Sequence, residues 1–183
     1  MTLRAGRPQK ANQKLSKQII LQTALPLVRE GGADAVSFRA LAKQLDVTAM
    51  AVTYHVGDKR KLLAELAELA FKNTLKHVAG TTPQERARNI LRAYCTRVIE
   101  NVQLLRAILN DTSLIGSELE QITEALHACT RELDSSDDGQ TLLFLLIDYT
   151  HGFALSAASG ESNPLTIDDY TPGIDWILTN AKT

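Results

Sequence analysis

Apolar residues recur at intervals of three and four along most of the chain, which is the period of an amphipathic helix. The first such segment begins near Leu15, and its apolar face is formed by Ile19, Ile20, Leu27 and Val28. We expect this helix to kink at Pro26 and to end at Gly31-Gly32. No strand-like alternation and no internal repeat interrupts the series. The pattern predicts an all-α fold of roughly nine helices.

Two short segments follow the first helix, and a hydroxyl residue precedes each. Ser37 comes before residues 38–45 and Thr48 comes before residues 49–56, and such hydroxyls cap the exposed amides of a helix start. The turn between the segments holds Asp46, one of the few residue types besides glycine that tolerate a positive φ. Small and apolar residues stand where the two helices would cross: Leu41, Ala42, Leu45, Val47 and Val52. The arrangement predicts a helix-turn-helix.

Longer helices are expected over residues 59–78, 83–100 and 102–111. Asp58 precedes the first of these as an N-cap. Thr82 and Glu85 form a capping box around a proline, which marks a helix start. Ser117 and Glu120 form a second box, for a helix that ends near residue 134.

The most hydrophobic segment covers residues 141–160 and reads as a helix buried on most sides. Asp148 and His151 make it too polar to span a bilayer. Small residues along it would permit a second helix to approach closely: Gly152, Ala154, Ala157 and Ala158. We therefore expect it to pair with a second copy of the chain. A Thr-Pro pair opens a short last helix over residues 171–176.

Composition narrows the class of protein. The chain is 44% hydrophobic and 22% charged, which excludes a disordered chain, a collagen and a disulfide scaffold. Cys95 and Cys129 lack the spacing of a metal or redox site, so we expect two buried thiols in a reducing compartment. The N-terminus makes a poor secretory signal and no apolar run is long enough to cross a membrane, so a cytoplasmic location is expected.

Charge is divided unequally along the chain. Residues 1–80 carry 13 Lys and Arg against 6 Asp and Glu, while residues 81–183 carry 7 against 15. A basic module joined to an acidic one is therefore expected, and the basic module is a candidate for contact with phosphates.

Residues 37–66, SFRALAKQLDVTAMAVTYHVGDKRKLLAEL, resemble the DNA-binding module of the TetR family of bacterial transcriptional regulators. His55-Val56 and Lys59-Arg60 are most similar to the tetracycline repressors within that family. The resemblance extends over about residues 17–70. It implies four parts: a flexible basic arm (1–14), a helix-turn-helix domain (15–57), a connecting helix (58–80) and a helical ligand-binding and dimerisation domain (81–183).

The resemblance also implies which residues contact double-stranded DNA: Arg39, Thr48, Ala49, Met50, Thr53, Tyr54, His55 and Lys59. Arg39 matches a base-reading arginine, and a guanidinium can bind guanine bidentately. Thr48 and Lys59 match phosphate contacts at helix starts. Thr53 replaces a tyrosine of the family, and the arm segment AGRPQK resembles segments that enter the minor groove.

In the acidic half the resemblance implies a pocket for a small-molecule effector and a two-fold homodimer. The candidate ligand-binding residues are Tyr94, Arg97, Arg106, Tyr149, His151 and Phe153. No cofactor and no metal are expected, because His77, His127 and His151 lack metal-ligand spacing. Tetracycline with magnesium is not the expected effector, because tetracycline repressors hold the drug-bound metal with histidines, whereas Leu75 stands at the approximate matching place here and no clear second histidine follows.

The predicted function is that of a regulator, expected to be a repressor, which binds a palindromic operator as a homodimer and is released by an effector. Two alternatives stay open. The first is a helical dimerisation or scaffold protein that does not bind a DNA sequence specifically, because α-helical residues 49–56 offer few hydrogen-bonding side chains. The second is an all-α enzyme that uses Asp148 and His151, although no nucleophile or phosphate-loop motif accompanies them.

Overall fold

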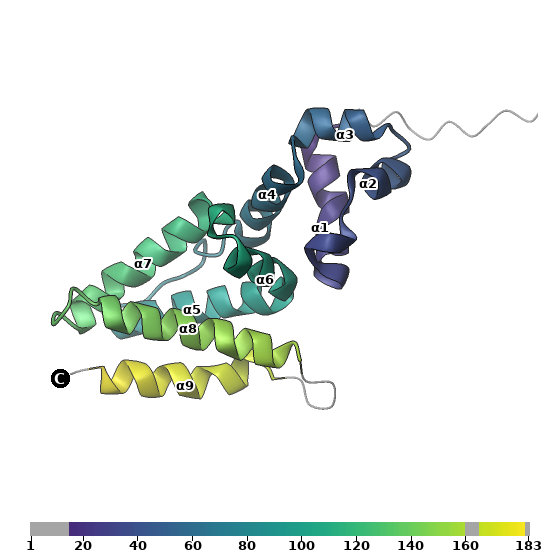
Figure 1. The fold of residues 1–183 in the computed structure, drawn as a ribbon. Coiled ribbons are helices and arrows are strands. Elements are labelled where there is room, and N and C mark those ends of the chain that lie inside the picture. Colours follow the sequence, from purple (N-terminus) through teal and green to yellow (C-terminus); the bar gives the residue numbers. More distant parts are fainter. Residues whose placement is uncertain (1–14, 160–164, 182–183) are drawn as a thin grey trace, which may run out of the picture.

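The computed structural model describes residues 15–159 and 165–181, and the predicted arm at residues 1–14 lies outside them. The described residues contain nine α-helices, one 3-10 helix and no strand, which confirms the predicted all-α fold (Figure 1). Their bounds are α1 Lys17–Ala35, α2 Phe38–Leu45, α3 Ala49–Val56, α4 Lys59–Phe71, α5 Pro83–Glu100, α6 Val102–Asn110, η1 Thr112–Leu114, α7 Ser117–Leu133, α8 Gln140–Ala157 and α9 Ile167–Asn180.

Helices α1 to α3 form a small N-terminal group, and α4 leads from it to the larger group α5–α9 (Figure 1). The small group has a core of fully buried side chains: Ile20, Ala24, Val28, Leu41, Val52 and Val56. The break predicted at Gly31-Gly32 is present, because the backbone leaves helical geometry at Gly32, with φ +73° and ψ −172°. A short helical stretch follows this kink, so the element as a whole runs to Ala35. Pro26 lies inside α1.

The connecting helix is shorter than predicted, because α4 ends at Phe71 and not near residue 78. Asn73 adopts a left-handed φ of +61°, which a continuing helix does not allow. Its backbone amide donates to the Glu118 carboxylate of α7, 3.3 Å away. The contact with α7 therefore replaces another helical turn.

Two helix starts in the larger group differ from the prediction. The expected box of Ser117 with Glu120 is absent, because the Ser117 hydroxyl donates to Glu68 of α4 at 3.0 Å and Gly116 takes the capping position. Helix α9 begins at Ile167, not at Thr171, and runs to Asn180. Its start is a capping box that the prediction missed, made by Thr166 and Asp169.

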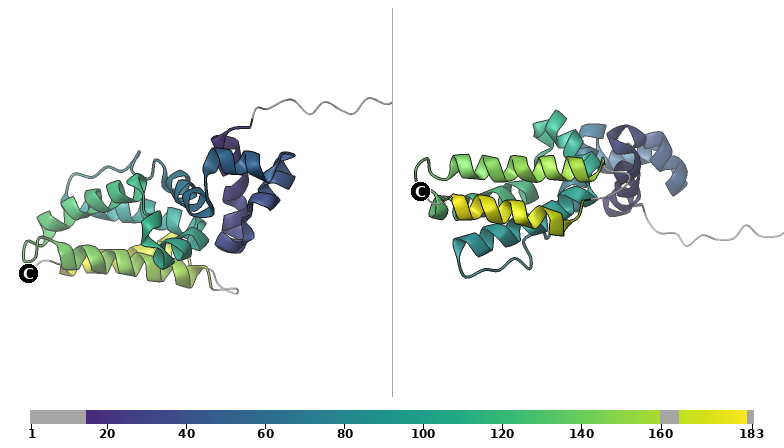
Figure 2. Two further views of the ribbon diagram at one scale, coloured as in Figure 1. Left: turned by 45° about the horizontal axis from the view of Figure 1, so that its top comes forward. Right: turned by 90° about the horizontal axis from the view of Figure 1, so that it is seen from below.

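Helix α5 lies at the centre of the larger group, where it packs against α7, α8 and α9. Figure 1 and the right view of Figure 2 show α8 and α9 side by side. The expectation that α8 is buried on most sides is wrong for a single chain, because Phe144 is 56% and Leu145 50% exposed. Trp176 of α9 is 68% exposed.

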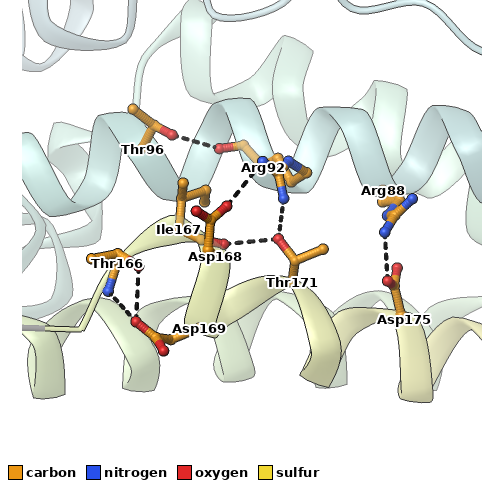
Figure 3. Close-up of polar contacts among 9 residues, drawn as sticks. All are labelled: Arg88, Arg92, Thr96, Thr166, Ile167, Asp168, Asp169, Thr171 and Asp175. Carbon is orange, nitrogen blue, oxygen red and sulfur yellow. Dashed lines mark hydrogen bonds and ion pairs between the residues drawn. The ribbon is translucent and has the colours of Figure 1, made fainter.

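Polar contacts fix α9 against α5 (Figure 3). Arg88 donates to Asp175 at 2.6 Å. Arg92 donates to the hydroxyl of Thr171 and lies 3.8 Å from Asp168. The central helix α5 therefore holds α9 in place through these contacts. Within the described ranges, no helix combines the length and the apolar character needed to cross a bilayer.

Candidate nucleic-acid interface and ligand cavity

Both helices of the α2–α3 pair begin at the caps that the sequence predicts. The Ser37 hydroxyl accepts the amide of Ala40 at 3.1 Å, and the Thr48 hydroxyl accepts that of Ala51 at 3.2 Å. Asp46 adopts φ 56° and ψ 45°, the left-handed conformation expected for the turn. The structure therefore confirms a helix-turn-helix in its local geometry.

One side of α3 faces away from the core. Val52 and Val56 are buried, whereas Met50 is 82% and Tyr54 86% exposed. Ala49 and Thr48 lie at the start of the helix, which leaves its exposed amides close to any approaching phosphate. Large apolar side chains left exposed in this way indicate an interaction surface.

The remaining DNA-contact candidates lie around the same pair of helices. Thr53 is exposed, although its hydroxyl already donates to the Ala49 carbonyl at 3.1 Å. His55 is half-buried and packs edge-on against Tyr54, with ring centres 5.5 Å apart. Arg39 is exposed on α2.

Lys59 stands at the start of α4, where its ammonium lies 3.2 Å from the carboxylate of Asp34. Both side chains are largely open to solvent, and pairs of this kind contribute little stability. A phosphate could therefore replace Asp34 as the partner of Lys59 at small cost. Arg60 and Lys61 follow at once, so three cations begin this helix.

A cavity of about 180 Å³ lies inside the larger group of helices, between α5, α6, α7 and α8. Its lining consists of Tyr94, Leu105, Ile108, Ile115, Leu119, Ile122, Thr123, Leu126, Ile147 and His151. Ile115, which is 43% exposed, and Thr123 are the exposed members of this lining, so the mouth of the cavity lies beside them. Apolar cavities that contain a few polar groups are typical of small-molecule sites.

Two candidate residues from the sequence meet in this cavity. The Tyr94 hydroxyl and His151 Nε2 share a hydrogen bond of 2.8 Å. Burial lowers the pKa of His151, and the charge of Asp148 offsets only part of that effect. Burial also raises the pKa of Tyr94. Both side chains are therefore uncharged at neutral pH.

The other four ligand candidates lie outside the cavity lining. Arg97 pairs with Glu100 on its own helix at 3.3 Å, and Arg106 is exposed. Tyr149 stacks on Tyr170 and Phe153 packs edge-on against the same ring. The apolar lining from α6 and α7 was not predicted, since its spacing is also that of an ordinary core.

Three sets of contacts join the part of the chain beside the cavity to α1 and α4. Arg29 of α1 donates to the side-chain oxygen of Asn101 at 2.8 Å, and Asn101 is fully buried at the start of α6. Arg60 of α4 donates to the Ser113 hydroxyl at 2.8 Å and lies 3.7 Å from Asp111. These links connect residues beside the cavity with the helices that carry the candidate DNA contacts.

Glu68, in the last turn of α4, provides the third set. Its carboxylate accepts the Ser117 hydroxyl and the amide of Glu118, at 3.0 and 3.3 Å. The segment from η1 to the start of α7 is therefore held by α4 at two points. Ile115, at the cavity mouth, lies between them.

Comparison with known proteins shows what the N-terminal helices are similar to. The sequence profile described as "Bacterial regulatory proteins, tetR family" matches residues 20–66. The similarity to that family therefore lies in α1 to α4. Tetracycline repressor protein class C of Escherichia coli is 35% identical over 68 residues, which are 37% of this chain and 30% of that repressor. The chain thus matches less than a third of the length of that curated relative.

The fold of the whole chain resembles solved structures of tetR-type regulators. A TetR transcriptional regulator from Streptomyces coelicolor has a TM-score of 0.75 at 20% identity, covering 91% of this chain and 97% of that one. BioQ with its double-stranded DNA operator has a TM-score of 0.71 at 20% identity, covering 92% of this chain and 98% of that one. ActR from S. coelicolor with (S)-DNPA has 0.70 at 19%, covering 91% and 97%.

Proposed function

We propose that this protein is a transcriptional regulator, acting as a repressor, that binds a palindromic DNA operator as a homodimer and leaves it when a small molecule fills the cavity. The observation that carries the proposal is the capped α2–α3 pair with its exposed α3 face. BioQ, which shares the fold, was solved on a double-stranded DNA operator, and ActR was solved with a small molecule. Both relatives support the two halves of the proposal.

In this proposal α3 enters the major groove. Arg39 binds a guanine edge, while Ala49 and Met50 contact thymine methyl groups. Phosphates are bound by Lys59 and by the side chains of Thr48, Thr53, Tyr54 and His55. The basic balance of the first 80 residues adds non-specific attraction to the duplex.

A second copy of the chain covers the α8–α9 face. Phe144, Leu145 and Trp176 give that face large exposed apolar side chains. A side chain added at Gly152 would meet no atom of its own chain within 4 Å, so a partner helix has room to approach there. A two-fold dimer presents two copies of α3 about 34 Å apart, one helical turn of DNA.

The proposed release is a two-state change. A ligand that favours one position of α6 and of the 111–118 segment would shift α4 through the Arg60 and Glu68 contacts. The spacing of the two α3 helices would change with it. Ligand and operator then weaken each other's binding by the same factor.

This assignment keeps the domain boundaries expected from the sequence: residues 15–57 bind DNA, residues 58–80 form the connection, and residues 81–183 bind the ligand and form the dimer.

The tetR family and this fold are those of regulators, not of enzymes. Among the described residues, no group of three or more His, Cys, Asp or Glu side chains could hold a metal ion. We place the protein in the cytoplasm, where its proposed DNA partner lies.

The test is binding to the duplex between the gene of this regulator and its neighbour, followed by fluorescence anisotropy at several salt concentrations. Affinity should fall steeply with salt. Arg39→Ala should lose about 5- to 150-fold in operator affinity, the cost of one base contact. Arg131→Ala, which removes an exposed arginine from α7, is the matched control and should bind like wild type. Salt-insensitive binding, or an Arg39→Ala variant equal to the control, would instead favour the scaffold alternative.

A further inference from the structure

The size of the cavity limits what it can hold. Its volume of about 180 Å³ compares with roughly 150 Å³ for an engineered protein cavity that binds benzene. One six-membered ring with one or two small substituents therefore fills it. A multi-ring molecule does not fit unless the helices separate.

The lining excludes charge. Seven of its ten residues are aliphatic, and the described lining contains no Asp, Glu, Lys or Arg. The Thr123 hydroxyl is already committed to the Leu119 carbonyl at 3.0 Å. An ion in this cavity would lose its hydration without gaining a counter-charge, which costs several kcal/mol.

One polar pair remains, and it has spare hydrogen-bonding capacity. A tyrosine hydroxyl has one donor and two acceptor positions, and a neutral imidazole has one of each. If Tyr94 donates to His151, its oxygen can still accept a hydrogen bond. If His151 donates instead, the Tyr94 proton is free to be donated. A ligand hydroxyl can both donate and accept, so it matches either arrangement.

We infer that the cavity binds an uncharged molecule of about one substituted ring that carries a single hydroxyl group, placed against Tyr94 and His151. Ile115 is one of the two lining residues that are exposed, so it lies where the cavity opens to solvent. The inference names the effector class of the proposed function and depends on it only for the regulatory consequence. Binding itself can be tested without DNA.

The experiment titrates the full-length protein at pH 7 by calorimetry with three probes of one shape: toluene, 4-methylphenol and 4-methylbenzoate. We expect 4-methylphenol to bind about 3- to 10-fold tighter than toluene, as one added hydrogen bond allows. The benzoate should bind at least about tenfold more weakly than the phenol, because its charge is not compensated. Tightest binding of the benzoate, or no binding of any probe to the folded protein, would overturn the inference.

Single substitutions test whether the probes bind in this cavity. Tyr94→Phe should abolish the preference for 4-methylphenol over toluene while toluene affinity is kept. Tyr149→Phe is the matched control, since it removes the hydroxyl of a tyrosine outside the lining, and it should keep the wild-type preference. Ile115→Trp should weaken all probes by closing the mouth. Equal behaviour of Tyr94→Phe and wild type would overturn the inference.

DNA binding by the same preparation separates the two proposals. Probe binding in the expected order with no DNA binding refutes the proposed function and supports the cavity chemistry. Operator binding without any probe binding refutes the cavity chemistry alone.

Discussion

Asp46 holds the turn between α2 and α3 in a left-handed conformation. Its amide and that of Val47 both donate to the Ala42 carbonyl, which closes the end of α2 and sets the direction of α3. An aspartate tolerates this backbone at a cost of about 1 kcal/mol, and glycine tolerates it without strain.

Substitution at Asp46 tests that role. Asp46→Ala should lower the free energy of unfolding by about 1 kcal/mol, because alanine lacks the polar side chain that eases a positive φ. Asp46→Gly should leave the free energy of unfolding unchanged or raise it, because glycine adopts a positive φ without strain. Urea denaturation measures both, and Glu124→Ala on the exposed side of α7 serves as the control. Equal losses in the alanine and glycine variants would contradict a backbone origin.

His151 gives a pH-dependent stability. Burial lowers its pKa below the ordinary value of 6.5, so between the folded and unfolded pKa values the unfolded chain binds more protons. Stability should therefore fall as the pH drops below about 6.5. His151→Phe should flatten the unfolding free energy between pH 7 and pH 5 relative to wild type. An unchanged slope in the variant would assign the loss to other groups.

Sequence reasoning reached Tyr94 and His151 but also chose four residues that lie outside the cavity lining. The sequence shows that a residue is polar and could bind a ligand. Whether the residue reaches the ligand depends on which side of the helix it occupies. Arg97 is three residues from Tyr94 on α5, yet its partner is Glu100. The aliphatic lining was missed because Ile122 and Leu126 have the spacing of any buried helix face.

At the scale of elements, local spacing predicted the box of Thr82 and Glu85 but missed the equally local box of Thr166 and Asp169, and it failed where a distant group intervenes. Thr82 and Glu85 are three residues apart, and both hydrogen bonds of their box form. The Ser117 hydroxyl binds Glu68, 49 positions away, so its local spacing was misleading. The end of α4 was missed for the same reason, because Glu118 accepts the amide of Asn73.

A substitution on α8 tests whether this helix forms the dimer interface. Gly152→Leu should leave the single chain folded, because the added side chain meets open space there, yet it should dissociate a homodimer that packs on α8. Analytical ultracentrifugation distinguishes the two states. Gln121→Leu on α7 adds the same side chain to another exposed helix position and should remain dimeric. A Gly152→Leu dimer as stable as the control would exclude α8 from the interface.

At the scale of the whole molecule, the contacts of α4 with the 111–118 segment are the proposed route between cavity and DNA. The double variant Asp111→Ala, Ser113→Ala removes both partners of Arg60 and keeps that cation on α4. We expect the DNA affinity without ligand to change little. The ratio of DNA affinities with and without 4-methylphenol should move toward one, measured by anisotropy.

One result would exclude this route. If the double variant responds to 4-methylphenol as wild type does, the coupling runs elsewhere. Arg29→Ala then becomes the informative change, because it breaks the contact of α1 with Asn101. Sequence alone predicted two modules of opposite charge, but these pairings join residues about 50 and 70 positions apart, which no local pattern reveals.

Trp176 is the one tryptophan of the chain, and it lies largely in solvent on α9. An indole that leaves water emits at shorter wavelength, so this side chain makes the protein its own optical reporter. On dilution, the fluorescence emission of Trp176 should shift to longer wavelength as the subunits separate. The protein concentrations over which the shift occurs give the dissociation constant of the dimer. No label is needed, and the signal comes from a single position because the chain has no second tryptophan.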